Sequence, residues 1–68
     1  MKKHVAILRK ELGMNQTDFW SRVSVTQSAG SRYESGRTVP SPVKTLLTLT
    51  YGTEKESYAL YLRLRKAP

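Results

Sequence analysis

Residues that begin or end helices interrupt this sequence at short intervals. Glycines follow apolar stretches, while Asn, Thr and a Pro-Ser-Pro triplet precede the next ones. These positions are Gly13, Asn15, Thr26, Gly36, Pro40, Ser41, Pro42 and Gly52. Glycine commonly ends a helix, and a short polar side chain commonly caps the start of one. The sequence therefore divides into short segments, and we predict an all-α fold, a compact bundle of four to five helices.

Apolar residues recur at helical spacing in the first four segments. We expect a first helix that ends at Gly13, a second over residues 16–23, and a third that Thr26 caps and that ends near Ser35. Ser41 is expected to cap a fourth helix, with Pro42 at its first position. The residues that mark the apolar faces are Val5, Leu8, Leu12, Phe19, Trp20, Val23, Val43, Leu46, Leu47 and Tyr51.

The last segment carries two conflicting patterns. Thr53 and Glu56 have the spacing of a capping box, which favours a fifth helix. Leu60, Leu62 and Leu64 alternate with polar residues instead, which is the period of a strand. We favour a helix over residues 58–66 and leave a short strand as the alternative.

Length and composition exclude several classes of protein. A chain of 68 residues is too short for a two-domain enzyme, and with no cysteine and one histidine it has neither disulfides nor a metal cage. Asp18, Glu34 and the serines have no histidine partner nearby, and no glycine-rich phosphate loop is present. We therefore expect that the protein is not an enzyme and binds no metal or cofactor. Oligomerisation is the remaining source of extra stability.

The charge balance points to a polyanionic partner. Twelve Lys and Arg residues against five Asp and Glu residues give a net charge of +7, which suits nucleic acid or an acidic membrane surface. The apolar run of residues 5–8 is too short for a signal peptide, and no run approaches the ~20 residues of a membrane span. We expect a cytoplasmic, nucleoid-associated protein without a membrane partner.

The third helix has the chemistry of a helix that reads DNA. Gln27, Ser28, Ser31 and Arg32 fall on one side of it. Gln pairs naturally with adenine and Arg with guanine in the major groove, while Ser accepts several bases. Two short helices joined by a tight turn are the arrangement of a helix-turn-helix. The alternative is an ordinary solvated helix face.

The stretch 12–19 and the run Ser31-Arg32-Tyr33-Glu34-Ser35-Gly36-Arg37, followed by Pro40, resemble the lambda-repressor-like (XRE-type) helix-turn-helix family over residues 5–51. The resemblance implies a prokaryotic or phage transcriptional regulator, a repressor, that binds operator DNA as a dimer. It makes the third helix the recognition helix. It also implies phosphate contacts, which fall here on Gln16, Thr26, Arg37 and Thr38.

The resemblance further implies a buried salt bridge between Arg9 and Glu34. Three positions depart from the family pattern: Trp20 stands where a small residue is usual, Ser24 where Gly is usual, and Gly30 where an aliphatic residue is usual. We interpret Trp20 and Gly30 as a paired exchange of volume, with the indole laid over the bare helix surface. Ser24 then needs a left-handed backbone or a different turn.

The sequence separates a DNA-binding unit, residues 1–52, from a C-terminal segment, residues 53–68. That segment carries Tyr58, Tyr61, Leu62 and Leu64, which we predict to form the interface of a homodimer. The competing interpretations are a last core helix that folds back on the first, and a protein-interaction module, such as an antitoxin or adaptor, that uses the same Tyr/Leu segment to hold a partner protein from a neighbouring gene.

Overall fold

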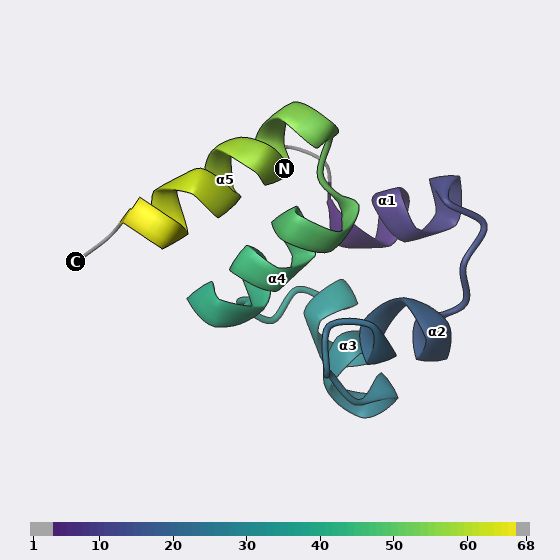
Figure 1. Ribbon diagram of the computed structural model, residues 1–68. Coiled ribbons are helices and arrows are strands. Elements are labelled where there is room, and N and C mark those ends of the chain that lie inside the picture. The colour runs from purple at the N-terminus through teal and green to yellow at the C-terminus, as the bar shows by residue number, and fades with distance from the viewer. Residues whose placement is uncertain (1–3, 67–68) are drawn as a thin grey trace. The chain divides into compact units, whose positions relative to one another are not determined.

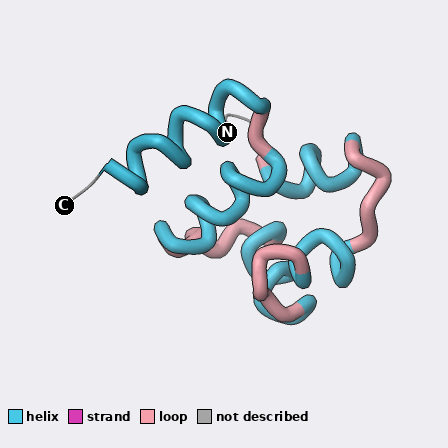
Figure 2. The backbone as a smooth tube through the Cα atoms, viewed as in Figure 1, coloured by secondary structure: helices cyan, strands magenta, loops and turns pink. Residues whose placement is uncertain are grey.

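The computed structural model describes residues 4–66, which form five α-helices and no strand (Figures 1 and 2). The helices are α1 (Val5–Glu11), α2 (Gln16–Ser21), α3 (Gln27–Glu34), α4 (Ser41–Tyr51) and α5 (Glu54–Lys66). The predicted all-α fold class is confirmed. None of the helices in the described region is long and apolar enough to cross a bilayer.

The chain packs as two units. One unit ends at Val39 and holds α1, α2 and α3, with α2 against α3; the other begins at Pro40 and holds α4 and α5, packed on each other. In the first unit the buried side chains all come from α2 and its end: Phe19, Trp20 and Val23. The Trp20 ring meets Phe19 edge-on at 5.2 Å between centroids and lies 5.6 Å from Tyr33 of α3. This aromatic cluster holds α2 and α3 together.

Side-chain caps start all three helices in the first unit. His4 Nδ1 caps α1 by accepting from the backbone N–H of Ala6 at 3.2 Å, and the other two caps are those expected from the sequence. The Asn15 side chain accepts a hydrogen bond of 2.8 Å from the backbone N–H of Asp18, and Thr26 Oγ1 accepts one of 3.2 Å from Ala29. Gly13 follows α1 at φ 69°, the left-handed conformation in which glycine carries no steric penalty. α2 ends at Ser21, two residues before the predicted limit, and Val23 is reached through a turn bonded to Trp20 O at 3.1 Å.

The start of α4 differs from the prediction. Pro40 is the N-cap, Ser41 is already helical, and no side chain caps the helix. Pro40 has an extended backbone at φ −61° and ψ 150°, a conformation that its ring favours and that suits an N-cap. The cap prediction for Ser41 was therefore wrong by one residue.

A reciprocal capping box starts α5 and decides between the two patterns of the last segment. The backbone N–H of Thr53 donates to Glu56 Oε1 at 2.9 Å, and the backbone N–H of Glu56 donates to Thr53 Oγ1 at 3.1 Å. Two donors that a helix start leaves unpaired are thus satisfied. The helix continues through Leu60, Leu62 and Leu64, so the strand alternative is wrong.

Some apolar positions are not buried as their spacing predicted. Leu12 is 48% exposed and Leu46 is 41% exposed, while Leu47 is the buried residue of α4. α1 has no buried residue among those described. Helical spacing identifies which residues share a face. Which of these residues are buried depends on the element that packs against the face.

Candidate nucleic-acid interface

α3 presents a polar face to solvent. Gln27, Ser28 and Arg32 are exposed and Ser31 is half-buried, whereas Gly30 on the other side is buried. The first turn of α3 carries no acidic residue, so nothing there repels a polyanion. The four side chains predicted to read bases therefore lie together on one accessible helix surface.

The chain after α3 turns back toward that surface. Gly36 adopts φ 115°, and the backbone N–H of Arg37 donates to the carbonyl of Arg32 at 3.1 Å. Ser31, Arg32, Ser35 and Arg37 line one open hollow. The structure thus brings Arg37, a predicted phosphate contact, beside Arg32, a predicted base reader. Thr38 follows as an exposed residue.

The last residue of α3, Glu34, is the centre of a hydrogen-bond network. Arg9 on α1 forms a two-pronged pair with it, from Nε to Oε2 at 2.9 Å and from Nη2 to Oε1 at 3.0 Å. The Arg9 and Glu34 side chains are only 13% and 8% exposed. Arg9 Nη1 also donates to the carbonyl of Met14 at 2.9 Å. α1, the turn after it and α3 are therefore fixed to one another through a single ion pair.

Two side chains of α2 complete the network. Trp20 Nε1 donates to Glu34 Oε2 at 2.8 Å, and Gln16 Nε2 donates to Glu34 Oε1 at 3.2 Å. Each carboxylate oxygen therefore accepts two hydrogen bonds. Sequence reasoning placed Arg9 against Glu34 but missed both α2 donors. The only signal available was that a buried indole N–H needs an acceptor.

The network controls the charge state of Glu34. Burial by itself raises the pKa of a carboxyl group, but the hydrogen bonds from Arg9, Trp20 and Gln16, with the positive charge of Arg9, act against it. The pKa of Glu34 consequently lies below its ordinary range. Glu34 is therefore ionised at neutral pH, the state that the four N–H donors require.

Trp20 and Gly30 are in direct contact. A Cβ built on Gly30 would overlap Cδ1 and Cγ of the indole and lie 2.6 Å from its Nε1. The indole is fully buried and covers the helix surface where another residue would project. The paired exchange of volume inferred from the sequence accounts for both unusual residues.

Ser24, in the turn between α2 and α3, has φ 61°. This left-handed conformation is one of the two that we expected for a serine at a position where glycine is usual. It is unfavourable for a residue with a side chain, and it lets the backbone N–H of Val25 donate to the carbonyl of Trp20 at 3.0 Å. The turn therefore keeps its tight path without glycine.

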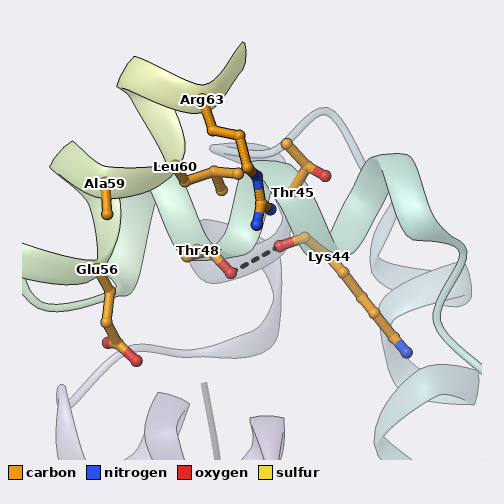
Figure 3. Close-up of a pocket in the computed structure, with 7 residues that line it drawn as sticks. All are labelled: Lys44, Thr45, Thr48, Glu56, Ala59, Leu60 and Arg63. Atoms are coloured by element: carbon orange, nitrogen blue, oxygen red, sulfur yellow. Dashed lines mark hydrogen bonds between the residues drawn. The ribbon is translucent and has the colours of Figure 1, made fainter. Parts of the chain in front are cut away.

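The residues predicted for a dimer interface lie on α5 and are exposed; Tyr58 is the most exposed, at 63%. Tyr58 and Tyr61 also line an open hollow with Leu49 of α4. On another side of α5, Leu60 and Arg63 project toward Thr45 and Thr48 over a shallow groove (Figure 3). Glu56 and Ala59 line the same groove.

No group of three or more potential metal ligands occurs within residues 4–66.

Two short helices joined by a tight turn, the second with an exposed polar face, define a helix-turn-helix DNA-binding domain. The RsaL-like HTH domain matches residues 6–50, and the chain belongs to this family. Comparisons with curated proteins and with solved structures gave no match. The membership supports the DNA-binding part of the expectation, while the resemblance to lambda-repressor-like proteins in particular stays a prediction.

Proposed function

We propose that this protein is a sequence-specific transcriptional regulator, a repressor, that inserts α3 into the major groove of its operator. The observation that carries the proposal is the exposed face of α3, with Arg32 and Arg37 lining one open hollow. On this proposal Gln27, Ser28, Ser31 and Arg32 contact base edges. Such a helix reads sequence only if it is held rigidly, and the four hydrogen bonds on Glu34 supply that rigidity.

The proposed phosphate contacts are Gln16, Thr26, Arg37 and Thr38. Thr26 Oγ1 accepts a hydrogen bond from Ala29, and its hydroxyl proton stays available to a phosphate oxygen. Gln16 gives one amide N–H to Glu34 and keeps a second. Glu34 thereby orients the amide, and Arg37 adds a positive charge at the end of α3. A net charge of +7 supports the same partner.

The proposal includes a homodimer. One recognition helix offers about four groove-facing side chains, and two helices spaced by one DNA turn, about 34–36 Å, double those contacts on a near-palindromic operator. The exposed Tyr58, Tyr61, Leu62 and Leu64 of α5 support an interface there. A repressor of this kind acts in the cytoplasm by occupying the DNA that polymerase needs.

Two alanine substitutions test the proposal on duplexes that the wild-type protein selects from a random pool. Arg32→Ala should cost about 1–3 kcal/mol of binding free energy on the selected sites and relax specificity at one position. Arg37→Ala should weaken binding to all sequences and lower the salt slope by about one unit. Lys10→Ala removes an equal charge from an exposed position on α1 that is assigned no DNA contact, and serves as the control. Equal losses on selected and random DNA for Arg32→Ala would remove the base-reading role.

A protein-interaction module, such as an antitoxin or adaptor, is the second candidate. The exposed Tyr and Leu side chains of α5 favour it, because monomeric proteins seldom leave such a group in water. On this alternative α5 would hold a partner protein encoded by a neighbouring gene. The two candidates separate in the same assay, since binding to duplex DNA that weakens steeply with salt is expected only of the first.

A further inference from the structure

One exposed face of α5 carries a regular stripe of side chains, which borders α4 at an open hollow with Leu49. Glu54, Tyr58, Tyr61 and Arg65 follow one another at spacings of four, three and four residues, which keeps them on one face of a helix. All four are exposed. Leu62 and Leu64, also exposed, flank the stripe, one on each side. Leu60 and Arg63, which line the groove with Thr45 and Thr48 of α4, fall on the opposite side of the helix.

Contacts within one chain already order this stripe. The rings of Tyr58 and Tyr61 stack with centroids 6.2 Å apart and 22° between their planes. The guanidinium carbon of Arg65 lies 5.3 Å from the Tyr61 centroid. A guanidinium held over a ring face keeps its N–H donors at the edge. The stripe is therefore an aromatic centre with a carboxylate at one end and a guanidinium at the other.

We propose that α5 pairs with the α5 of a second copy of this chain, antiparallel and about a two-fold axis, with Tyr58 opposite the partner's Tyr61 and Glu54 opposite the partner's Arg65. The register follows from arithmetic: opposed residues in such a pair have numbers with a constant sum, and 58 + 61 equals 54 + 65. One choice of axis therefore satisfies both the aromatic and the charged pairs. The inference rests on the proposed dimer and specifies its geometry.

Charge selects this occupant over others. The stripe holds one acid and one base, so it has no net charge with which to attract DNA or an acidic peptide. α5 begins with Glu54 and Glu56 and ends with Arg63, Arg65 and Lys66. An antiparallel pair places each acidic end beside a basic end and opposes the two helix dipoles, whereas a parallel pair places like charges together. A second, antiparallel copy thus supplies a basic group for Glu54 and an acidic group for Arg65.

The interface is small, since a helix of 13 residues is only about 20 Å long. A single helix pair falls at the lower limit of specific interfaces, so we expect weak association of the free protein. Sedimentation equilibrium from about 10 µM to about 1 mM covers that range.

Charge swaps on the full chain test the register. Glu54→Arg and Arg65→Glu should each weaken self-association about tenfold or more, since each turns both attractive contacts of the dimer into repulsive ones. An equimolar mixture of the two variants should associate to within about threefold of wild type, because each chain then supplies what the other lacks. The double variant should also recover, which a parallel pair would not predict. Lys66→Glu makes the same charge change beside the stripe and should leave association within about threefold of wild type.

Far-UV circular dichroism on each variant checks that α5 remains helical, and recovery in the mixture shows directly that the single variants are folded. A wild-type chain that stays monomeric throughout, single variants that associate like wild type, or a mixture no better than its components would each overturn the inference. The assay contains no DNA, so its failure leaves the DNA-binding proposal standing. Loss of salt-dependent DNA binding would likewise leave the dimer standing.

Discussion

Glu34→Gln should be the most informative single substitution in the α1–α3 unit, because it keeps the volume of the side chain and removes only its charge. Each carboxylate oxygen of Glu34 accepts two N–H groups: Oε1 from Arg9 and Gln16, and Oε2 from Arg9 and Trp20. A carboxamide has one oxygen. Whichever way it is turned, its NH2 group faces two donors and both of those hydrogen bonds are lost.

The magnitude follows from the burial of the pair. Hydrogen bonds to charged groups contribute about 1.5–3 kcal/mol each, and removing one partner of a buried ion pair costs about 3–5 kcal/mol. The Glu34 side chain is 8% exposed and the Arg9 side chain 13%, so screening by water reduces the cost of breaking this ion pair only a little. We expect a loss of about 3–4 kcal/mol in the free energy of unfolding. In a domain this small that lowers Tm by about 15–25 °C.

Urea unfolding followed by Trp20 fluorescence and by far-UV circular dichroism measures the loss. The chain has one tryptophan, and its indole N–H binds Glu34, so the emission reports on the network itself. Glu54→Gln removes the same charge from an exposed residue at the start of α5 and should change stability by less than about 1 kcal/mol. Gln16→Ala provides a milder test than Glu34→Gln, because it removes one of the four hydrogen bonds on Glu34 and keeps the tryptophan whose fluorescence reports unfolding. A loss below about 1 kcal/mol in Glu34→Gln, or a double-mutant coupling of Arg9 and Glu34 near zero, would refute the reasoning.

Three further predictions concern the same unit. The pKa of Glu34 is lower in the folded than in the unfolded protein, where it is about 4.5. The stabilisation by ionised Glu34 is therefore complete above that value and is lost as pH falls through the folded value. Acid titration of the unfolding free energy should show this loss in wild type and not in Glu34→Gln. Gly30→Ala should destabilise by about 1–3 kcal/mol in spite of better helix propensity, because the new Cβ meets the indole, and a stabilised variant would mean that the indole moves freely. Ser24→Gly should raise the free energy of unfolding by up to about 1 kcal/mol, and Tm with it, because glycine adopts φ 61° without strain. Ser24→Val should lower both. The opposite order would place the turn in another conformation.

Sequence reasoning succeeded where one residue's chemistry demands a particular neighbour. Gly30 has no side chain and Trp20 is too large for its place, so the two had to be explained together, and the structure places them in contact. For Ser24 the sequence left two possibilities, a left-handed backbone or a different turn, and the structure shows the first. The capping box of Thr53 and Glu56 outweighed the strand-like alternation of leucines after it, because it satisfies backbone donors that the helix start would otherwise leave unpaired.

The contacts and burial that the sequence did not predict depend on how the helices lie in space, which the spacing of residues along the chain does not encode. Gln16 and Glu34 are 18 residues apart, and nothing in either position indicates that the amide reaches the carboxylate. Leu46 and Leu47 are adjacent apolar residues of α4, yet Leu46 is 41% exposed and Leu47 only 4%, since neighbouring residues of a helix point in different directions. Ser41 has the right chemistry for an N-cap, but the extended backbone falls on Pro40 instead.

The separation between what stabilises α3 and what α3 displays has an evolutionary consequence. Its stabilising contacts come from Gly30, Tyr33 and Glu34, whereas the Gln27, Ser28 and Arg32 side chains take part in no hydrogen bond within residues 4–66. Exchanging those exposed side chains leaves the free energy of folding almost unchanged. Descendants of such a chain can therefore diversify the surface of this helix one residue at a time, without passing through unfolded intermediates and without compensating changes elsewhere.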